Sequence, residues 1–444
     1  MFFICSALND SEGEILAGFE RAEPHELRYL FIDFNAYFAS VEQHDEPALR
    51  EQPVIVTPLK SEHSGAIAAS YEAKALGISR GTSVIEARQL CPDIAIRAAR
   101  HDRYVELHGL LMAEIGRHIP VTQVCSVDEC LCALDTTETG RDAALAVARR
   151  VKEGIYRNVG ISLRASIGLA ASPLLAKLAA ELQKPDGLTL IDNSMLPDAL
   201  ADLPLRAIPG VGEGVETRLI RAGVHDFRGL WDIQPKQARA IWGSVEGERF
   251  HYGLHGFDIR REEPAAKRMI GHSRVLSGTD RDPERARIVA RALLLKAASR
   301  LRLYDLYSGA MHLTVKLSGG GALGHDVPFR ATQNSWRFLH ELDEFWPHMV
   351  ALVRHREGAE ASLKMVSCYL HALQPEPPAL DLFVSPEIDA CDARDAALWR
   401  SIDQLNRRYG KETVALGSQE GLDLNYLGVK IAFSRVPDAA EFQC

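Results

Sequence analysis

The sequence predicts a multidomain α+β protein, and three observations support this fold class. The chain has 444 residues, which is more than a single hydrophobic core accommodates. Strand-like and helix-like segments alternate between residues 27 and 191, and they alternate again from residue 269 onward. Between these regions, residues 192–257 read as helices with short loops. We therefore expect a mixed sheet with crossover helices, a small helical domain and a second α/β domain.

The first region opens with a strand at residues 28–33 (RYLFID), and a helix begins directly after it. A long helix is predicted from Arg103 to His118, because apolar residues recur there at helical spacing. Ser172 and Pro173 provide an N-cap and a first-turn proline for a helix that ends near residue 183. The other predicted elements are strands at 53–57, 65–70, 94–98, 121–127, 130–134 and 163–170, and helices at 71–76, 83–90 and 141–159.

The last region is predicted to contain a four-stranded sheet and two helices. Its strands are expected at 269–276, 309–317, 327–331 and 363–373, and its helices at 283–303 and 336–353. The charged segment 258–267 separates it from the helical region, and the run 374–378 (QPEPP) is a stiff linker. A further helix is predicted at 393–407.

The composition is that of an ordinary globular protein. Hydrophobic residues make up 46% of the chain, and no apolar run is long enough to span a bilayer. The N-terminus has no basic region of the kind that begins a secretory signal. Eight cysteines without metal-type spacing indicate reduced thiols, so we expect a cytoplasmic protein with no membrane partner. The net charge of -9 disfavours nucleic acid, although phosphate contacts depend on local charge.

Two adjacent acidic residues, Asp128 and Glu129, lie inside an apolar run. They directly follow the predicted strand 121–127 (VTQVCSV). Adjacent residues of a strand point to opposite faces, so both carboxylates are exposed to solvent only if the strand breaks there. Two carboxylates at a half-buried strand end repel each other unless cations offset them. The alternative interpretation is a charged β-turn between two strands.

The strand at 28–33 also ends in an acidic residue, Asp33. Three carboxylates at neighbouring strand ends, Asp33, Asp128 and Glu129, would make a site for hard cations that prefer oxygen ligands. Mg²⁺ suits such a site better than zinc does. The sequence therefore predicts a two-metal phosphoryl-transfer site.

Five motifs in a fixed order extend this pattern. They are 33–42 (DFNAYFASVE), 70–74 (SYEAK), 126–129 (SVDE), 166–170 (SIGLA) and 175–187 (LAKLAAELQKPDG). In order and spacing they resemble the Y-family, lesion-bypass DNA polymerases of the DinB and UmuC type. The resemblance covers residues 27–276, with weaker similarity as far as residue 442. Five motifs in the right order are specific, whereas each one alone is weak.

The resemblance implies a template-directed DNA polymerase that adds deoxynucleotides to a primer in translesion synthesis and DNA repair. Its implied partners are primer-template DNA and deoxynucleoside triphosphates, its cofactors are two Mg²⁺ ions, and we expect a monomer. The implied domains are an N-terminal extension (1–27), a ferredoxin-like palm (28–36 and 100–191), small fingers (37–99), a helix-hairpin-helix thumb (192–257), a linker (258–268), an α/β little finger (269–374) and a C-terminal tail (375–444).

The resemblance also assigns the metal ligands, which are the catalytic carboxylates Asp33, Asp128 and Glu129 together with the backbone carbonyl of Phe34. Three other residues would bind the triphosphate: Tyr71, Lys74 and Lys184. Lys74 stands where the family usually has an arginine, so it offers a point charge rather than a bidentate fork. Ala68 stands where many members have a hydroxyl residue.

Phe38 occupies the steric-gate position of the family. There a bulky ring fills the space that a ribose 2′-hydroxyl would need, and ribonucleotides are excluded by the clash. The alternative is a core aromatic residue that packs against Leu30 or Val41, and Tyr37 could serve as well.

The helical region contains a motif that resembles a helix-hairpin-helix, residues 205–216 (LRAIPGVGEGVE). Gly210 and Gly212 would let backbone N–H groups and a helix N-terminus approach a DNA phosphate without a side chain in the way. The alternative is that these glycines only terminate the helices of an αα-hairpin.

A locally cationic window begins after the linker. Residues 265–305 contain ten basic residues against four acidic ones, although the whole chain is acidic. Lys267, Arg268 and Arg274 are expected to contact DNA phosphates in a salt-sensitive way that does not depend on sequence. The alternative is a solvated helix face.

A short apolar peptide follows the proline linker. Leu380, Asp381, Leu382 and Phe383 resemble a peptide that binds the bacterial sliding clamp, although Ala379 replaces the usual leading glutamine. Five residues of this kind also occur by chance.

Two other functions remain open from the sequence. A catalytically silent family member could act as a scaffold for another polymerase, although such a relative is expected to lose acidic ligands. A nucleotide cyclase with a palm-type domain is the second, and the helix-hairpin-helix and the cationic window argue against it.

Overall fold

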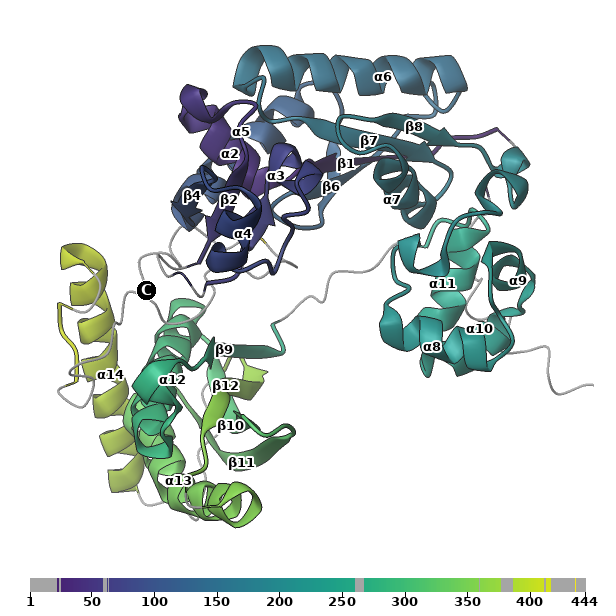
Figure 1. Cartoon of the computed structure of the whole chain (residues 1–444). Coiled ribbons are helices and arrows are strands. Elements are labelled where there is room, and N and C mark those ends of the chain that lie inside the picture. The colour runs from purple at the N-terminus through teal and green to yellow at the C-terminus, as the bar shows by residue number, and fades with distance from the viewer. Residues whose placement is uncertain are drawn as a thin grey trace, which may run out of the picture. The chain divides into compact units, whose positions relative to one another are not determined.

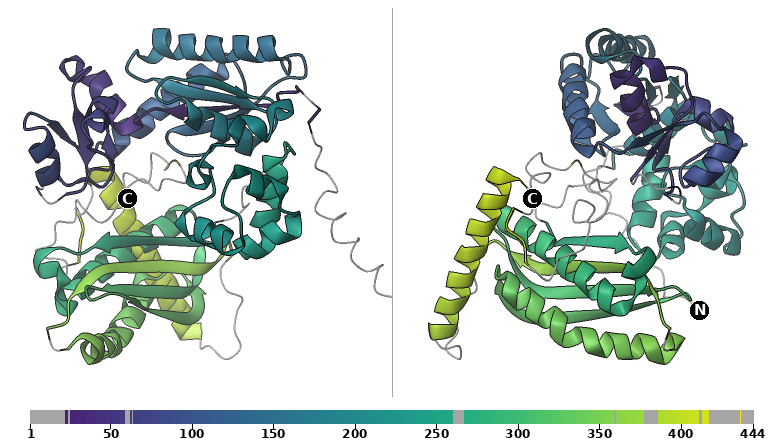
Figure 2. Two further views of the ribbon diagram at one scale, coloured as in Figure 1. Left: turned by 45° about the vertical axis from the view of Figure 1, so that its right-hand side comes forward. Right: turned by 60° about the vertical axis from the view of Figure 1, so that its left-hand side comes forward.

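The computed structural model describes residues 22–23, 25–58, 62, 64–259, 267–358, 360–376, 386–410, 413–416 and 436 (Figures 1 and 2). The chain divides into two compact units. The first comprises residues 1–262 and 433–436, and the second comprises residues 263–432 and 437–444.

The main sheet of the first unit has five strands in the order β5-β6-β1-β7-β8. β1 lies in the middle and runs antiparallel to β6 and β7, whereas β7 and β8 are parallel. The sheet is therefore mixed, as predicted. All six residues of β1 are buried, as expected for a central strand. The strands are β1 (Tyr29–Phe34), β5 (Val121–Val124), β6 (Glu129–Ala133), β7 (Ala165–Ala170) and β8 (Leu188–Ile191).

Helices α6 and α7 lie on opposite faces of this sheet (Figure 1). Tyr29 and Phe31 of β1 share a core cluster with Leu175 of α7. Because strand residues alternate between faces, Asp33 lies on the same face as these two aromatic residues. The predicted helix 141–159 ends as a π-helical turn at Ile155–Val159. The α-helices are α2 (Tyr37–Asp45), α5 (His101–Gly116), α6 (Arg141–Gly154) and α7 (Pro173–Leu182).

A second, smaller sheet forms the region predicted as fingers, with the strand order β3-β2-β4. Ile55, Ala73 and Ile78 belong to its core. β3 has two residues and is much shorter than the predicted strand 65–70. The elements are β2 (Val54–Thr57), β3 (Ala68–Ala69), α3 (Tyr71–Ala75), α4 (Val84–Leu90) and β4 (Ala95–Ala98).

The region 192–257 is helical, as predicted. Leu219, Phe227 and Leu230 join the core cluster that also contains Leu175 of α7, so these helices pack against the sheet-bearing part of the first unit. The helices are α8 (Glu213–Arg221), α9 (Phe227–Asp232), α10 (Pro235–Trp242) and α11 (Glu246–Leu254).

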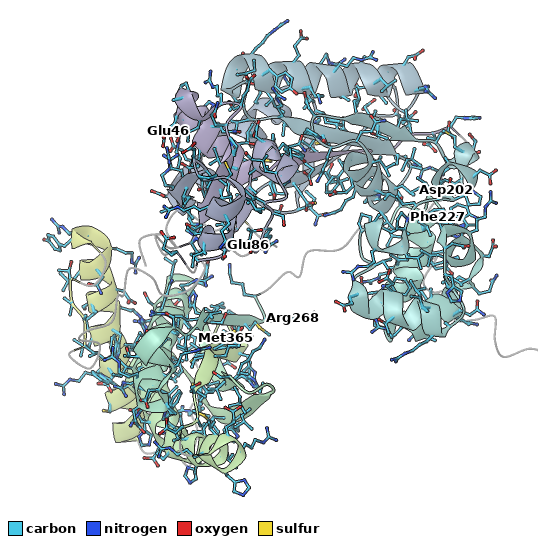
Figure 3. The ribbon with its side chains drawn as sticks, viewed as in Figure 1. Glu46, Glu86, Asp202, Phe227, Arg268 and Met365 are labelled. Atoms are coloured by element: carbon cyan, nitrogen blue, oxygen red, sulfur yellow. The ribbon has the colours of Figure 1, made fainter. Side chains whose placement is uncertain are left out.

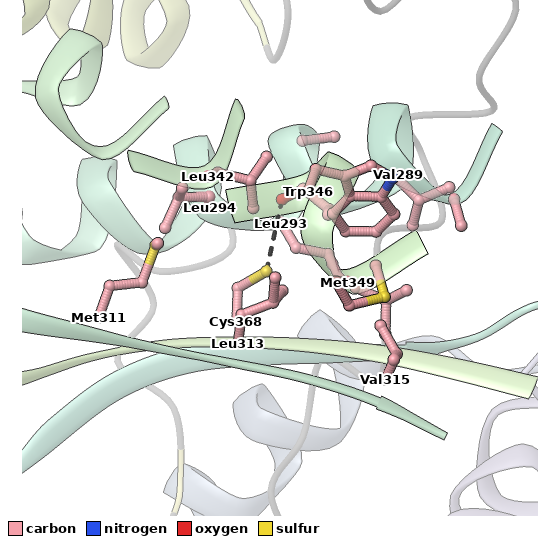
Figure 4. Packing of buried hydrophobic residues seen from close by; sticks show 14 of the residues in the cluster. Val289, Leu293, Leu294, Met311, Leu313, Val315, Leu342, Trp346, Met349 and Cys368 are labelled. Atoms are coloured by element: carbon pink, nitrogen blue, oxygen red, sulfur yellow. Dashed lines mark hydrogen bonds between the residues drawn. The ribbon is translucent and has the colours of Figure 1, made fainter. Parts of the chain in front are cut away.

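The second unit contains an antiparallel sheet in the order β11-β10-β12-β9, with two helices packed on it. Figure 4 shows Trp346 and Leu293 from the helices above Leu313 and Cys368 from the sheet. The indole N–H of Trp346 donates to the carbonyl of Pro283 at 3.2 Å, so its polar end is satisfied. The elements are β9 (Met269–Val275), α12 (Pro283–Leu303), β10 (Tyr307–Leu317), β11 (Ala322–Thr332), α13 (Ser335–Glu357) and β12 (Leu363–Gln374).

A last helix, α14 (Pro386–Tyr409), is longer than the predicted helix 393–407. It packs on the second unit through a buried ion pair, in which Arg302 Nε lies 2.6 Å from Asp403 Oδ2. The rings of Trp336 and Trp399 also meet, with centroids 5.1 Å apart. Partners that are distant in sequence thus fix this helix.

Two further features bear on the sequence predictions. Among the helices that the structure describes, none is both long and apolar enough to cross a bilayer. Cys130 and Cys132 of β6 are fully buried and belong to the core.

Candidate active site

Asp33 and Glu129 lie directly opposite each other where β1 pairs with β6. Paired residues of antiparallel strands point to the same face of the sheet, so these two carboxylates are neighbours. The apolar residues before Asp33 hold the strand in the core, and Asp33 itself is 7% exposed. The sequence prediction that two acidic strand ends meet is therefore confirmed for this pair.

A third carboxylate of this cluster comes from a residue that the sequence did not single out. Glu181 of α7 has a carboxylate oxygen within 4.8 Å of ligand atoms of both Asp33 and Glu129. Its position is three residues before Lys184 and four after Lys177, on one face of the helix. This spacing in the sequence could have pointed to Glu181, but it becomes meaningful only when the packing of α7 on the sheet is known.

Two lysines approach the acidic cluster. Lys184 Nζ lies 2.8 Å from Asp33 Oδ1 and 2.9 Å from Glu181 Oε1. Lys177 Nζ lies 2.6 Å from Glu129 Oε1. Each carboxylate of the cluster therefore has an ammonium partner.

Burial raises the pKa of Asp33 to about 7, although the Lys184 ammonium lowers it. The lysine thus offsets only part of the cost of keeping this carboxylate charged. Burial depresses the pKa of Lys184, but the Asp33 and Glu181 carboxylates outweigh it and raise the pKa above its usual value. The site favours additional positive charge.

Asp128 is held differently from its neighbour in sequence. Its carboxylate Oδ1 accepts a hydrogen bond from the Ser126 hydroxyl at 2.5 Å, and its backbone carbonyl accepts from Phe34 N at 2.8 Å. The backbone of Phe34 therefore joins the two acidic strand ends. Among the described residues, one group of three or more potential metal ligands has all its ligand atoms within 4.8 Å of one another, and it contains Asp33, Glu129 and Glu181 but not Asp128.

The donor set fits a hard cation. The acidic cluster presents carboxylate oxygens, and no thiol or imidazole belongs to it. The raised pKa of Asp33 shows that a carboxylate here lacks full compensation, which a divalent cation would supply. Asp33 and Glu129 are placed to hold such an ion, and the Asp128 carboxylate would have to move closer to join them.

The residues predicted to bind triphosphate lie close to the acidic cluster. The Lys74 ammonium sits over the Tyr71 ring, 4.2 Å from its centroid. Burial lowers the pKa of Lys74, and the Lys184 ammonium lowers it further. Burial also raises the pKa of Tyr71. α3 and the end of α7 thus bring two ammonium groups and one phenol together.

Phe38 is buried on α2 and stacks on a ring that the sequence did not identify. Its centroid lies 4.5 Å from that of Tyr104, with an angle of 16° between the planes. Tyr104 is itself held by Glu42, whose carboxylate accepts its hydroxyl at 2.7 Å. The alternative interpretation named Leu30 or Val41 as packing partners of Phe38, and the ring contact that the structure shows is the stack with Tyr104 of α5.

The glycines of the hairpin motif have distinct roles. Gly210 has φ of 95°, a conformation that residues with a side chain rarely adopt. Gly212 is the N-cap residue of α8, and a Cβ there would meet no atom within 4 Å. No neighbouring atom crowds the N-cap position, although the first turn of α8 carries the acidic residues Glu213 and Glu216.

Half of the ten basic residues in the cationic window pair with acidic residues within the second unit. Five of its arginines pair with aspartates: Arg274 and Arg285 with Asp280, Arg287 and Arg291 with Asp343, and Arg302 with Asp403. The side chain of Arg274 is 10% exposed, so this residue is mainly a partner of Asp280. Arg268, labelled in Figure 3, directly precedes β9 and is exposed, and Lys267 Nζ lies 3.5 Å from the centroid of the Tyr304 ring.

The peptide expected to bind a sliding clamp, Leu380 to Phe383, lies outside the described residues. It stays a prediction, as do the DNA contacts.

Comparison with known proteins agrees with this geometry. A family model described as the impB/mucB/samB family matches residues 32–181. DNA polymerase IV of Moorella thermoacetica is 33% identical over 394 residues, which is 87% of this chain and 94% of that relative. DNA polymerase IV of Pelotomaculum thermopropionicum is 32% identical over 395 residues, covering 87% of this chain and 93% of the relative.

Solved structures share the fold. One described as a Y-family DNA polymerase chimera has a TM-score of 0.67 at 19% identity, and the match covers 79% of this chain and all of that chain. The family match on residues 32–181 includes β1, β6 and α7, which carry the acidic cluster. With 33% identity to a relative that it covers almost completely, the chain belongs to the Y family of translesion DNA polymerases.

Proposed function

We propose that this polymerase extends a DNA primer by nucleotidyl transfer at the acidic cluster of its palm, using two Mg²⁺ ions. The observation that carries the proposal is the direct cross-strand pairing of Asp33 with Glu129, with Lys184 in contact with Asp33. Asp33, Asp128 and Glu129, with the carbonyl of Phe34, would hold the ions. Bound there, the ions would make the primer 3′-hydroxyl more acidic and neutralise the pyrophosphate leaving group.

The protein's own cations would complete the site. Lys184 lies between Asp33 and Glu181. If Asp33 ligates a metal, Glu181 still holds the Lys184 ammonium beside the site, where it can meet a triphosphate. Tyr71 and Lys74 would contribute a hydroxyl donor and a second positive charge. Because lysine lacks the fork of arginine, Lys74 would grip the phosphates less directionally.

Phe38 would select the sugar of the incoming nucleotide. Its ring is stacked on Tyr104 and cannot move in that direction without breaking the stack. A ring held in place can exclude a 2′-hydroxyl by a clash, while a deoxyribose fits.

The remaining residues would hold DNA outside the reaction centre. Gly210 and Gly212 would place the N-terminus of α8 at a phosphate, and Lys267 and Arg268 would contact the backbone. Arg274 would join them only by giving up Asp280. Leu380 to Phe383 would bind a sliding clamp. The polymerase would act as a monomer in the cytoplasm.

The experiment is primer extension with Mg²⁺ on plain and damaged templates, comparing the wild type with Asp128→Ala. Extension should be lost, while DNA affinity is retained because an acid attracts phosphate only through its metal. Asp135→Ala, in the exposed turn after β6, is the matched control and should extend normally. Undiminished extension by Asp128→Ala would contradict the proposal. A wild type that binds DNA but does not extend would favour a scaffold.

A further inference from the structure

The turn formed by residues 184–187 carries Lys184 and connects α7 to β8. Lys152, a residue of α6 that belongs to none of the sequence motifs, holds this turn through several hydrogen bonds. Lys152 Nζ lies 2.6 Å from the carbonyl oxygen of Asp186, 2.6 Å from its Oδ1 and 3.3 Å from the carbonyl oxygen of Gly187. It also donates to the carbonyl of Ala165 on β7 at 2.9 Å. One ammonium thus joins the turn to the sheet.

The π-helical segment after α6 adds a second contact. The hydroxyl of Tyr156 donates to the same Asp186 carboxylate oxygen, Oδ1. Asp186 has φ of 60°, a left-handed conformation that is uncommon for residues with a Cβ, although Asp adopts it more readily than most. Both donors, Lys152 and Tyr156, thus bind the residue of the turn that has this conformation.

A second set of hydrogen bonds joins the turn to Asn35, which follows the strand β1 that carries Asp33. Asn35, two residues after Asp33, accepts a hydrogen bond from Asp186 N at 2.6 Å through its Oδ1. Its Nδ2 donates to Ser166 Oγ at 3.0 Å, and Ser166 Oγ accepts from Gly187 N at 3.2 Å. Contacts with Lys152 and Tyr156 on one side, and with Asn35 and Ser166 on the other, thus fix the position of the turn relative to Asp33. From this position Lys184 contacts Asp33.

The contacts of Lys152 indicate what its charge does. Its side chain is 14% exposed, and a lysine that loses most of its water needs oxygen partners in return. Three of its four oxygen partners belong to the turn, and one belongs to the sheet. The Lys152 side chain therefore holds the turn that carries Lys184 at a fixed distance from β7.

We propose that Lys152 is a positioning residue for nucleotide binding. It holds turn 184–187 so that the Lys184 ammonium stands where the triphosphate of an incoming deoxynucleotide binds. The inference rests on the proposed role of Lys184 in triphosphate binding. It extends the binding machinery to a helix on the opposite face of the sheet from α7.

The test is Lys152→Met, which keeps the length of the side chain and removes the ammonium. We expect the affinity for a deoxynucleoside triphosphate, measured on DNA with a dideoxy-terminated primer, to fall about tenfold. In single-nucleotide incorporation, KM should rise by a similar factor and kcat should change much less. Arg149→Met, an exposed position of the same helix, is the matched control and should leave both unchanged. A lowered kcat at constant KM, or no change, would overturn the proposal.

A double-mutant cycle separates positioning from a general structural role. If Lys152 acts through Lys184, adding Lys152→Met to Lys184→Met should weaken nucleotide binding no further. Fully additive losses would contradict the proposal. If Lys184→Met itself leaves nucleotide affinity unchanged, the proposed function of Lys184 fails, whatever Lys152→Met does.

Tyr156→Phe covers the case in which Lys152→Met does not fold. It removes one hydroxyl from Asp186 and leaves the packing of the ring in place. We expect nucleotide affinity to fall about threefold, as for a single hydrogen bond. Unchanged affinity in a folded Tyr156→Phe protein would count against the anchoring of the turn.

Discussion

In the palm, three carboxylates from β1, β6 and α7 lie together with two lysines, and burial still raises the pKa of Asp33 to about 7. The second unit also concentrates charge in its cationic window, but five arginines of that window pair with three aspartates of the same unit. The cluster of the first unit still favours an added cation, whereas the paired arginines of the second unit mainly hold its elements together. Clusters of charge in a sequence can therefore serve different purposes, which only the placement of partners distinguishes.

The largest expected effect tests the palm side of this comparison. Asp33→Asn should reduce primer extension by roughly three orders of magnitude, because it removes a charged metal ligand. Folding should tolerate the change, since burial already penalises this charge. In the metal-free wild type, the folded state binds more protons than the unfolded state between pH 3.8 and about 7. Its stability should therefore contain a component that falls as pH rises through this range, and Asp33→Asn should lack it. Urea unfolding against pH measures this.

A second variant tests whether the aromatic stack beside the acidic cluster selects the sugar. Phe38→Ala should raise the ratio of ribonucleotide to deoxynucleotide incorporation about a hundredfold, because the clash with the 2′-hydroxyl disappears. Deoxynucleotide incorporation should fall only modestly. The measurement is kcat/KM for a matched pair of nucleotides. A ratio that does not change would place the gate elsewhere and leave Phe38 as a core residue stacked on Tyr104.

The third prediction addresses the second unit, where charge is expected to stabilise rather than bind. Arg302→Met leaves the Asp403 carboxylate, 7% exposed, without its partner. It should lower the free energy of unfolding of this unit by about 3 kcal/mol. Arg337→Met is the control, because Arg337 is 50% exposed and pairs with Glu341 on the surface of α13. It should cost less than about 0.5 kcal/mol. Equal losses in the free energy of unfolding for the two variants would contradict the idea that buried arginine pairs stabilise this unit.

The smallest expected effect concerns Arg268, at the start of β9. Arg268→Gln should reduce the slope of log affinity for duplex DNA against log salt by about one, without a change in unfolding. Arg274→Gln should do the opposite, with lower stability and an unchanged slope, because Asp280 already occupies this guanidinium. Salt titrations of DNA binding decide between the two. A reduced slope for Arg274→Gln alone would mean that Arg274, and not Arg268, contacts DNA.

Much of the fold could be predicted from local sequence. The bounds of α12 agree with the predicted helix 283–303, because Asp282 and Pro283 begin it and its apolar spacing is regular. The predicted meeting of Asp33 and Glu129 is confirmed, but the predicted strand 121–127 is too long, because β5 ends at Val124 and Glu129 begins β6. The shortness of β3 and the π-helical end of α6 did not follow, since tertiary contacts decide where such elements stop.

The rest of the site depends on contacts between distant segments. Glu181 and Lys177 have ordinary helical spacing in sequence, and only the seating of α7 on the sheet brings them to the carboxylates. Lys152 reaches turn 184–187 beside the first residue of β7, a contact that no local pattern indicates. The cationic window was expected to face DNA, but Asp343 and Asp403, which neutralise much of it, lie outside that window. A charge count within one window cannot include such partners.

The most direct measurement of the central claim is a crystal structure with primer-template DNA, a deoxynucleoside triphosphate and Mn²⁺, with anomalous scattering used to locate the ions. The account predicts two peaks about 3.5–4 Å apart. Asp33 and Glu129 would each contribute an oxygen about 2.1 Å from an ion, and Asp128 would have turned away from Ser126. Peaks bound only by the triphosphate, with Asp33 still paired to Lys184 and Glu129 to Lys177, would contradict it.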